Sequence, residues 1–260
     1  MVNLERRRKI LDILEKEGQI TTVSLEKRLG VTGATVRSDL REMDREGAVV
    51  RFHGGAALVD QSQLISPNEN YMKRSVMHVE EKRRIGRAAS KMVENGQTIF
   101  IDASSTAFHM IPFLNHLENL TIVTNGINTA MEIQRYSNFK TILIGGVLRS
   151  HSGAIEGLFC EDMLEKISGD VYFVSGNGFS PEAGLTGNNF YELELKRMCV
   201  KRCGKIVVLV DSSKLSNNST SSFIASSKID LLITDDGISE KQKKEIQNAG
   251  IPLIQAAVEI

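Results

Sequence analysis

The apolar positions of the first 30 residues repeat with the period of amphipathic helices. A first stripe approximates one helical face and ends before Gly18; it consists of Leu4, Ile10, Leu11, Ile13 and Leu14. Ile20 begins a short extended connection. Thr21 or Thr22 supplies the capping hydroxyl of a second helix that runs to about Leu29. The pattern therefore predicts two helices joined by an extended segment.

A third helix is predicted after Gly30, which stops the second, and Thr32 is its expected cap. Its apolar face is narrow, because the positions i, i+4 and i+7 are Val36, Leu40 and Met43. The opposite side carries Ala34, Arg37, Ser38, Arg41 and Arg45. We expect the first side to pack on a small domain and the second to present hydroxyls and guanidiniums outward.

A hairpin is predicted directly after this helix. Residues 48–53 alternate loosely like a strand, and Gly54 and Gly55 are typical turn residues. The order of helix, turn, helix and hairpin is that of a winged helix-turn-helix, which places one helix in the DNA major groove and a basic ribbon beside it. The side chains expected to reach base edges or phosphates are Arg37, Arg41, Arg51 and His53. The third helix alone is equally compatible with a solvated amphipathic helix.

A polar, weakly patterned stretch separates this unit from the rest of the chain. Pro67 disfavours a helix at the residue before it. We therefore assign residues 1–58 to a DNA-binding domain, 59–78 to a linker and 79–260 to a second domain.

In the second domain a helix is expected from Val79 to about Val93, and short apolar runs rich in β-branched residues follow it. These runs cover residues 98–101, 120–123, 141–144, 171–174, 205–210 and 231–233, and most precede a helix-like segment. Such alternation is typical of buried parallel strands in an open α/β sheet. The predicted fold class is therefore α/β, a winged helix-turn-helix followed by a mostly parallel sheet.

Polar residues follow these strands at the sheet edge where open α/β sheets bind ligands. Residues 104–106 (Ser-Ser-Thr) precede a helical run, and hydroxyls with free N–H groups at a helix start favour an anion such as phosphate. Lys214 adds a positive charge, and Asp102 and Asn125 are suited to sugar hydroxyls. Each has a plainer interpretation, because Ser, Thr and Asp at such places often only cap helices or form turns. Gly145 and Gly146 fit a chain turn equally well.

Composition restrains these interpretations without choosing among them. The chain carries 32 basic and 32 acidic side chains, and residues 1–59 hold 11 Lys and Arg against 9 Asp and Glu. Only the placement of charge therefore argues for DNA. Cys160, Cys199 and Cys203 are too few for a disulfide framework and offer no four-ligand zinc set. Without a signal peptide or a long apolar stretch, the expected location is the cytoplasm.

The N-terminal segment closely resembles the DeoR family of bacterial transcriptional regulators. The matching residues are Arg6-Arg7, Ile10, Leu14, Gly18, Leu25, Val31, Thr35-Val36-Arg37, Asp39-Leu40, Gly47, Arg51 and His53-Gly54-Gly55-Ala56. Ser38 departs from the second arginine that the family often has there, which suggests a different operator preference. With the resemblance, the expected DNA-binding set is Arg6, Thr22, Thr32, Ala34, Thr35, Arg37, Ser38, Arg41, Arg51 and His53.

The second domain resembles the sugar-sensing domain of the same regulators, related in fold to ribose-5-phosphate isomerase and glucosamine-6-phosphate deaminase. The resemblance implies a phosphorylated effector bound by Asp102, Ser104, Ser105, Thr106, Thr124, Asn125, Gly145, Gly146, Gly178, Thr186, Asp211 and Lys214. Ala103 stands where the family usually has glycine, and Leu215-Ser216 follow Lys214 instead of Phe-Gly. Wing sequence and length are most similar to repressors of hexitol operons such as that for galactitol.

The expected function is repression of a carbohydrate catabolic operon, relieved by a phosphorylated sugar or sugar alcohol. The partners are then a double-stranded operator, the effector and further copies of the chain, with no cofactor, no metal and no catalysis. One alternative is a sugar-phosphate isomerase or deaminase with an accessory DNA-binding domain, which would use carboxylates such as Asp102, Glu194 and Asp211. Another is that the second domain only mediates oligomerisation, which the altered Ala103 keeps open.

Overall fold

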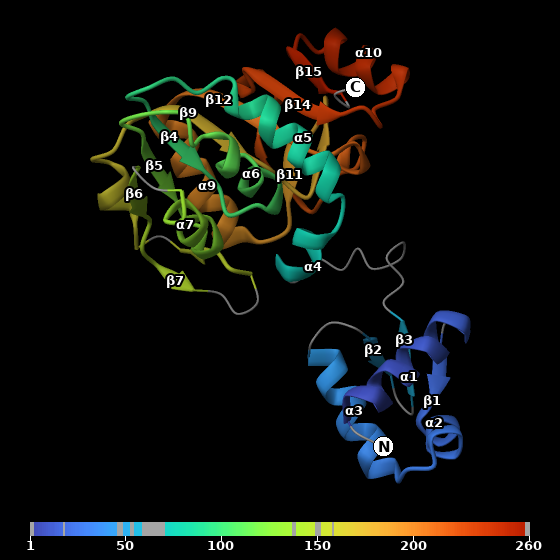
Figure 1. Ribbon diagram of the computed structural model, residues 1–260. Helices are drawn as coiled ribbons and strands as arrows, with labels where there is room; N and C mark the ends of the chain where they lie inside the picture. The colour runs from blue at the N-terminus through green and yellow to red at the C-terminus, as the bar shows by residue number, and fades with distance from the viewer. Residues whose placement is uncertain are drawn as a thin grey trace. The chain divides into compact units, whose positions relative to one another are not determined.

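The computed structural model describes residues 3–17, 19–45, 49–52, 55–58, 71–136, 139–148, 152–157 and 159–257. The chain divides into two compact units, residues 1–68 and 69–260 (Figure 1). Of the helices in these ranges, none combines the length and apolar character that a membrane span requires.

The first unit has the predicted helices and hairpin. Its elements are α1 (Asn3–Glu17), β1 (Gln19–Thr21), α2 (Thr22–Leu29), α3 (Gly33–Arg45), β2 (Val49–Phe52) and β3 (Gly55–Leu58). The strands pair antiparallel in the order β1-β3-β2, so the extended connection before α2 also joins the hairpin. One apolar cluster holds the unit together, and it includes Ile10, Leu14, Leu25, Val36, Leu40 and Met43. A winged helix-turn-helix topology is therefore confirmed.

The ends of α2 and the start of α3 follow from the residues at them. The Thr21 hydroxyl accepts a hydrogen bond from the Ser24 N–H at 3.2 Å, as an N-cap does. Gly30 ends α2 in the left-handed region, with φ at 63°, where a residue with Cβ is strained. The Thr35 N–H donates to the Thr32 hydroxyl at 3.4 Å, which supports the predicted cap of α3.

The second unit is built on a parallel sheet. Its strands pair in the order β15-β14-β12-β9-β4-β5-β6, and every pairing among them is parallel. Their bounds are β4 (Thr98–Ile101), β5 (Thr121–Thr124), β6 (Lys140–Leu143), β9 (Gly169–Val174), β12 (Cys203–Leu209), β14 (Leu231–Asp235) and β15 (Leu253–Ala256). The strands predicted from apolar runs are present, whereas the edge strand β15 was not predicted. From β4 the chain first adds strands on one side of the sheet, β5 and β6, and then on the other side, starting with β9. The order of the strands therefore reverses between β4 and β9.

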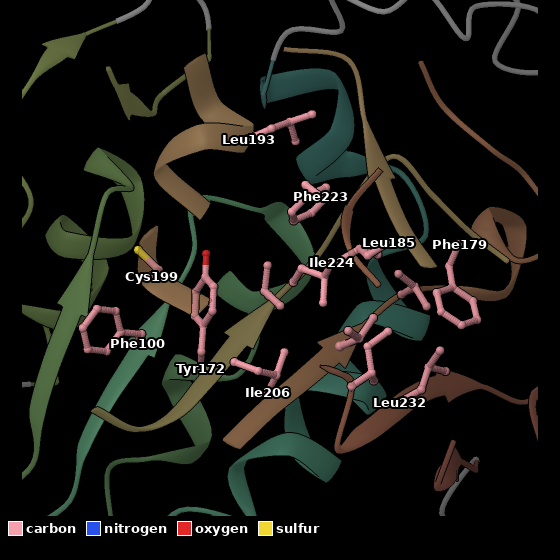
Figure 2. Packing of buried hydrophobic residues seen from close by; sticks show 14 of the residues in the cluster. Phe100, Tyr172, Phe179, Leu185, Leu193, Cys199, Ile206, Phe223, Ile224 and Leu232 are labelled. Atoms are coloured by element: carbon pink, nitrogen blue, oxygen red, sulfur yellow. The ribbon is translucent and has the colours of Figure 1, made fainter. Parts of the chain in front are cut away.

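Both faces of this sheet are covered, which explains the continuous apolar runs. Along β4, Ile99 and Ile101 join one buried cluster with α5 (Val79–Ser90), whereas Phe100 joins the other with α9 (Phe190–Arg202). Figure 2 shows part of the second cluster, in which Tyr172 and Cys199 pack near Phe100. Successive residues of a strand point to opposite faces, so burial of both faces requires apolar residues at every position.

Smaller elements surround the sheet. β10 (Gly178–Ser180), β11 (Gly184–Gly187) and β13 (Ser221–Ile224) form a separate antiparallel sheet, and β7 (Val147–Leu148) pairs with β8 (Ile155–Glu156). The remaining helices are α4 (Tyr71–Val76), α6 (Ser105–Phe108), α7 (Ile127–Ile133), α8 (Glu161–Leu164) and α10 (Glu240–Asn248), with short 3-10 turns at Ile111–Phe113, Ser212–Lys214 and Ser226–Lys228.

The segment predicted as a linker contains a helix, which corrects that part of the assignment. Residues 59–78 were assigned to a linker, and α4 occupies residues 71–76 of that range. The physical reason is burial: the Tyr71 ring is only 6% exposed and meets Phe108 edge-on, with ring centroids 6.5 Å apart. A helix so short has no apolar periodicity that the sequence alone reveals. Residues 59–70 lie outside the described ranges.

Candidate functional site

The outward face of α3 is the first candidate site. Ala34, Arg37, Ser38 and Arg41 are exposed, whereas Val36, Leu40 and Met43 on the other side are at most 1% exposed. The helix is therefore oriented as its sequence predicted, with two guanidiniums and two small residues facing solvent.

Arg6 has a different environment from these arginines. Its guanidinium forms an ion pair with Asp39 of α3, in which Nη2 lies 3.0 Å from the carboxylate Oδ1. The side chains of Arg6 and Asp39 are 11% and 3% exposed. This ion pair joins α1 to α3, so Arg6 helps to orient α3 and is not one of its exposed side chains.

The other residues expected to contact DNA are distributed unevenly. Thr22 is buried, and the hydroxyls of Thr32 and Thr35 lie 3.0 Å apart in one hydrogen bond at the start of α3. The Arg51 side chain and all of His53 lie outside the described residues, as does Gly54.

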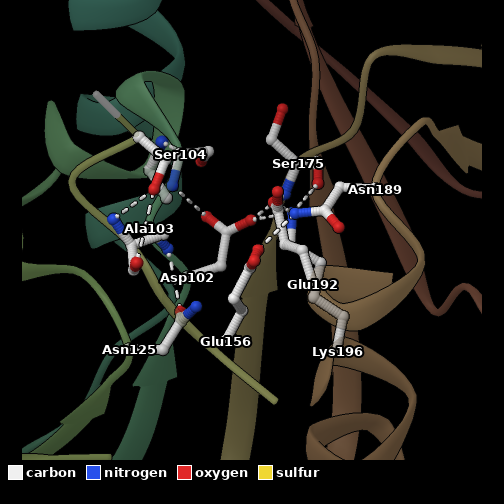
Figure 3. Close-up of polar contacts among 12 residues, drawn as sticks. Asp102, Ala103, Ser104, Asn125, Glu156, Ser175, Asn189, Glu192 and Lys196 are labelled. Atoms are coloured by element: carbon white, nitrogen blue, oxygen red, sulfur yellow. Dashed lines mark hydrogen bonds and ion pairs between the residues drawn. The ribbon is translucent and has the colours of Figure 1, made fainter. Parts of the chain in front are cut away.

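The second candidate site lies where the strand order of the sheet reverses. Asp102 follows β4 and Ser175 follows β9, and these two strands are neighbours. The Asp102 carboxylate accepts hydrogen bonds from the Ser104 N–H through Oδ1 and the Ser175 N–H through Oδ2, each at 3.0 Å (Figure 3). The carboxyl edge at such a reversal is where open α/β sheets form their ligand crevice.

A buried lysine from α9 completes this centre. Lys196 Nζ lies 3.0 Å from Asp102 Oδ2, 3.0 Å from Glu192 Oε1 and 2.9 Å from the Ser175 carbonyl oxygen (Figure 3). Each of its three N–H donors therefore has an acceptor. Burial alone would lower the pKa of Lys196, but the carboxylates of Asp102 and Glu192 outweigh it and raise that pKa. Lys196 thus connects α9 to the ends of β4 and β9 through its ion pairs and its hydrogen bond to Ser175.

Lys214 approaches the same serine from the loop after β12. Its Nζ donates to the Ser175 hydroxyl at 3.4 Å and lies 3.7 Å from Asp211 Oδ2. Burial, outweighing the attraction of Asp211, lowers the pKa of Lys214. For Asp211, burial raises the pKa, but Lys214 and the Ser213 hydroxyl prevail and lower it. Lys214 and Asp211 were both in the predicted set, and the structure brings Lys214 to Ser175, which was not in that set.

The hydroxyl run after β4 is only partly committed to capping. The Ser104 hydroxyl accepts from the Ala107 N–H at 3.1 Å, so the plainer interpretation as a helix cap holds for this residue. Ser105 is 3% exposed and Thr106 is fully buried. Within the described ranges, the Thr106 hydroxyl has no hydrogen-bond partner.

Asn125 and Thr124 organise the backbone beside this run. Asn125 Oδ1 accepts from the Ala103 N–H at 3.1 Å, and its Nδ2 donates to the Ile155 carbonyl at 2.9 Å. The Thr124 hydroxyl accepts from the Gly126 N–H at 3.0 Å. These groups, like Asp102, shape the loops around the site, and Ala103 is buried among them with 4% of its surface exposed.

Among the remaining residues of the predicted effector set, Thr186 and Gly178 have structural roles of their own. The Thr186 hydroxyl donates to the Gly178 carbonyl at 2.9 Å and accepts from the Ser219 N–H at 2.8 Å within the small antiparallel sheet. A Cβ at Gly178 would lie 2.2 Å from the Asn217 carbonyl oxygen. Gly145 and Gly146 lie between β6 and the β7–β8 hairpin.

A second buried lysine, Lys82 of α5, was not anticipated from the sequence. It is 3% exposed, and its Nζ donates to the carbonyls of Arg74 and Met77, the latter at 2.6 Å. Burial, reinforced by the nearby Lys214, lowers the pKa of Lys82 to about 8. Both unanticipated lysines carry a signal in the sequence, because each lies on an apolar helical face, Lys82 with Ile85 and Lys196 with Leu193 and Cys199.

Family models match both units. The family model described as "DeoR-like helix-turn-helix domain" matches residues 6–62, and the model described as "DeoR C terminal sensor domain" matches residues 77–236. Together these matches cover most of the chain, including α3 and the sheet edge that carries Asp102, Lys196 and Lys214.

Named relatives match along nearly the full length. The HTH-type transcriptional regulator GolR of Listeria innocua is 38% identical over 97% of this chain and 98% of its own. The glycerol-3-phosphate regulon repressor of Escherichia coli K12 is 30% identical over 90% of this chain and 92% of its own. The putative aga operon transcriptional repressor of Escherichia coli O157:H7 is 28% identical over 96% of this chain and 93% of its own.

Solved structures are matched only in part. A D-ribose-5-phosphate isomerase in complex with phospho-erythronic acid is similar with a TM-score of 0.40 and 17% identity, over 53% of this chain and 54% of that chain. An eIF2B beta structure from Chaetomium thermophilum gives a TM-score of 0.41 at 10% identity, over 59% and 48%. Scores of this size carry no argument about ligand or reaction.

Proposed function

This chain belongs to the DeoR family of transcriptional regulators, and we propose that it represses a carbohydrate catabolic operon until a phosphorylated sugar or sugar alcohol releases it. The observation that carries the DNA-binding half is the orientation of α3. Its apolar side is buried and Arg37 and Arg41 are exposed on the opposite side, as a recognition helix requires. The winged topology around it supports the same proposal.

A phosphate-bearing effector is supported by the charges at the sheet edge. Lys214 and Lys82 lie close enough for the charge of Lys214 to act on Lys82, and the pKa of both is lowered, largely by burial. Cations held close together in a poorly solvated place favour an anion between them. The buried Thr106 hydroxyl, which has no partner among the described residues, adds a donor for phosphate or a sugar hydroxyl.

Release from DNA requires that the effector distinguish between two conformations of the protein. The effector must bind more tightly to a conformation that fits DNA poorly, because a ligand with equal affinity for both conformations shifts nothing. Since one recognition helix reads only a few base pairs, we infer that at least two copies bind a two-fold symmetric operator, in the cytoplasm where the DNA is.

The alternative enzymatic function finds less support. The named relatives are transcriptional regulators. The Asp102 carboxylate, one proposed base, is committed to two backbone N–H groups and Lys196, and this favours a structural role over proton abstraction. Turnover of ribose 5-phosphate or glucosamine 6-phosphate by the purified protein would revive that function.

The regulator proposal is tested by DNA binding. We expect the protein to shift a labelled fragment from upstream of its own gene at modest salt, and to leave an equally long coding fragment unshifted. Adding members of a sugar-phosphate panel, including a hexitol phosphate, is expected to release the fragment for one member. Absence of specific binding refutes the DNA-binding function, whereas binding that no panel member relieves, with no heat of binding in calorimetry, favours the oligomerisation platform.

Effector affinity is expected to fall as the pH rises through about 8. Burial, with Lys214 and Arg74, lowers the pKa of Lys82 to about 8, although Asp211 and Glu81 oppose that shift. Above that pH the free protein holds Lys82 mostly neutral, so binding an anion beside it must take up a proton, and affinity declines with pH. The phosphate of a phosphomonoester loses its second proton near pH 6, so this group does not titrate between about pH 7.5 and 9.5.

Calorimetry across that range should show a loss of up to about tenfold per pH unit above about 8. A flat profile contradicts the placement of the anion near Lys82.

A further inference from the structure

The first element described after the boundary between the two units is α4. The boundary lies between residues 68 and 69, and α4 begins at Tyr71. The chain that enters the second unit from the DNA-binding unit therefore reaches the sheet edge through this helix. The contacts of α4 therefore determine which ligands can affect the connection between the two units.

Tyr71 packs α4 onto the loops of the candidate site. Its ring meets Phe108 of α6, the short helix that Ser104 caps after β4. A Cβ at Gly153, next to β8, would lie 3.7 Å from Tyr71 Cγ. Among the described residues the Tyr71 hydroxyl has no hydrogen-bond partner, although it is buried. Burial raises the pKa of Tyr71 to about 12.

Lys82 holds the other end of α4. Its ammonium donates to the carbonyls of Arg74 and Met77, which are the last turn of α4 and the residue after it. The last carbonyl groups of a helix have no hydrogen-bond partners inside the helix. Here the buried Lys82 ammonium is the donor to two such carbonyls. Lys82 therefore holds the C-terminal end of α4 in place through these two hydrogen bonds.

Arg74 adds a third cation to this group. Its charge acts on both Lys82 and Lys214, and Asp211 is the nearby carboxylate that both lysines share. Arg74 Nε is buried and, in the part of the chain that the structure describes, lacks a hydrogen-bond partner. Lys82, Lys214 and Arg74 therefore bring three cations to this part of the fold, and the Arg74 guanidinium keeps a buried donor that an anion would accept.

We propose that α4 forms one wall of the effector site, and that Arg74 and Tyr71 bind the anionic group of the effector directly. A bound effector then holds α4 in place. Because α4 is the first described element after the boundary between the units, effector binding can in this way influence the DNA-binding unit. This proposal rests on the proposed function, because it takes the effector to be a phosphate-bearing small molecule at the carboxyl edge of the sheet.

The test compares binding to the full-length protein and four variants by calorimetry. The probes are inorganic phosphate, ribose 5-phosphate, glucosamine 6-phosphate and a hexitol phosphate. Arg74→Gln removes the charge and Tyr71→Phe removes only the hydroxyl. Val76→Ala is the control on the same helix, where Val76 is 70% exposed, and Lys241→Gln is the control for loss of a cation, where the Lys241 side chain is 86% exposed.

For the probe that wild type binds best, Arg74→Gln is expected to weaken binding at least about tenfold, as the loss of one charge-assisted hydrogen bond does. Tyr71→Phe should weaken it a few-fold, and both controls should bind as wild type. Hydrogen exchange of the amides of residues 71–77 should slow when the probe is added to wild type, and not when it is added to Arg74→Gln. If Arg74→Gln does not fold, Arg74→Lys replaces it; this variant keeps the charge but loses the planar donor fork, so it should bind a few-fold more weakly than wild type.

Equal affinity of wild type and the α4 variants Arg74→Gln and Tyr71→Phe overturns this inference and leaves the proposed function standing. Exchange at residues 71–77 that does not respond to the probe overturns the coupling as well. If no probe binds wild type although the operator is bound, the phosphorylated effector and this inference both fail, whereas the DNA-binding function does not.

Discussion

Replacing Lys196 by methionine is expected to lower the free energy of unfolding of the second unit by about 3–5 kcal/mol. The methionine side chain fits a similar volume, but it leaves the Asp102 carboxylate buried without its cation. Asp102 is 1% exposed and lies 3.0 Å from the lysine nitrogen. The Ser175 carbonyl loses a donor as well. A lone buried charge costs far more than the pair contributes, so breaking the pair is severe.

Tyrosine fluorescence measures this selectively. The chain has no tryptophan, and its four tyrosines, at positions 71, 136, 172 and 191, all belong to the second unit. Urea unfolding followed at tyrosine therefore reports on that unit within the intact protein. The matched control is Lys201→Met, the same change at an exposed position of α9, which should stay within about 0.5 kcal/mol of wild type. A loss below about 1 kcal/mol for Lys196→Met contradicts the buried ion pair, because removing one partner of such a pair is expected to cost several times more.

Replacing Arg37 or Arg41 by alanine is expected to weaken operator binding by about 1–3 kcal/mol for each contact that is bidentate to a base. Both side chains are exposed on α3, opposite Val36, Leu40 and Met43, so their loss removes contacts and leaves the core intact. A contact to phosphate instead weakens binding equally for every sequence and flattens the dependence of affinity on salt.

Fluorescence anisotropy with the operator and with a scrambled duplex, at several salt concentrations, separates these two outcomes. Arg83→Ala removes an exposed arginine from α5 and is the control, since its loss should change neither affinity nor salt slope. Unchanged operator affinity in both α3 variants means that the outward face of α3 does not read DNA.

Local features of the sequence were enough for much of the fold. The caps at Thr21 and Gly30, the buried face of α3 and the apolar runs of the sheet each depend on residues within one or two turns or one strand. β15 was not predicted because the polar Gln255 interrupts the apolar run expected of a buried strand. An edge strand has only one neighbour, so its pattern is weaker.

The candidate site in the second unit was predicted less completely. Its residues are distant in the sequence and come together only because their strands are neighbours in the sheet. The edge residues Asp102, Asp211 and Lys214 were identified by their position after a strand, and Lys214 reaches Ser175 as a partner. Gly178 and Thr186, placed in the same set, make contacts inside the small antiparallel sheet. Nothing in the local sequence distinguishes these two cases.

The sequence by itself determined the output end of this protein, since α3 and the caps around it lie between Thr21 and Arg45. Helix periodicity and capping act over a few residues, so the exposed arginines can be read directly. Only the tertiary structure decided that Lys196 meets Asp102, far away along the chain, and that α4 belongs to the second unit. Burial and ion pairing depend on which strands become neighbours, and that choice is made by the packing of the whole sheet.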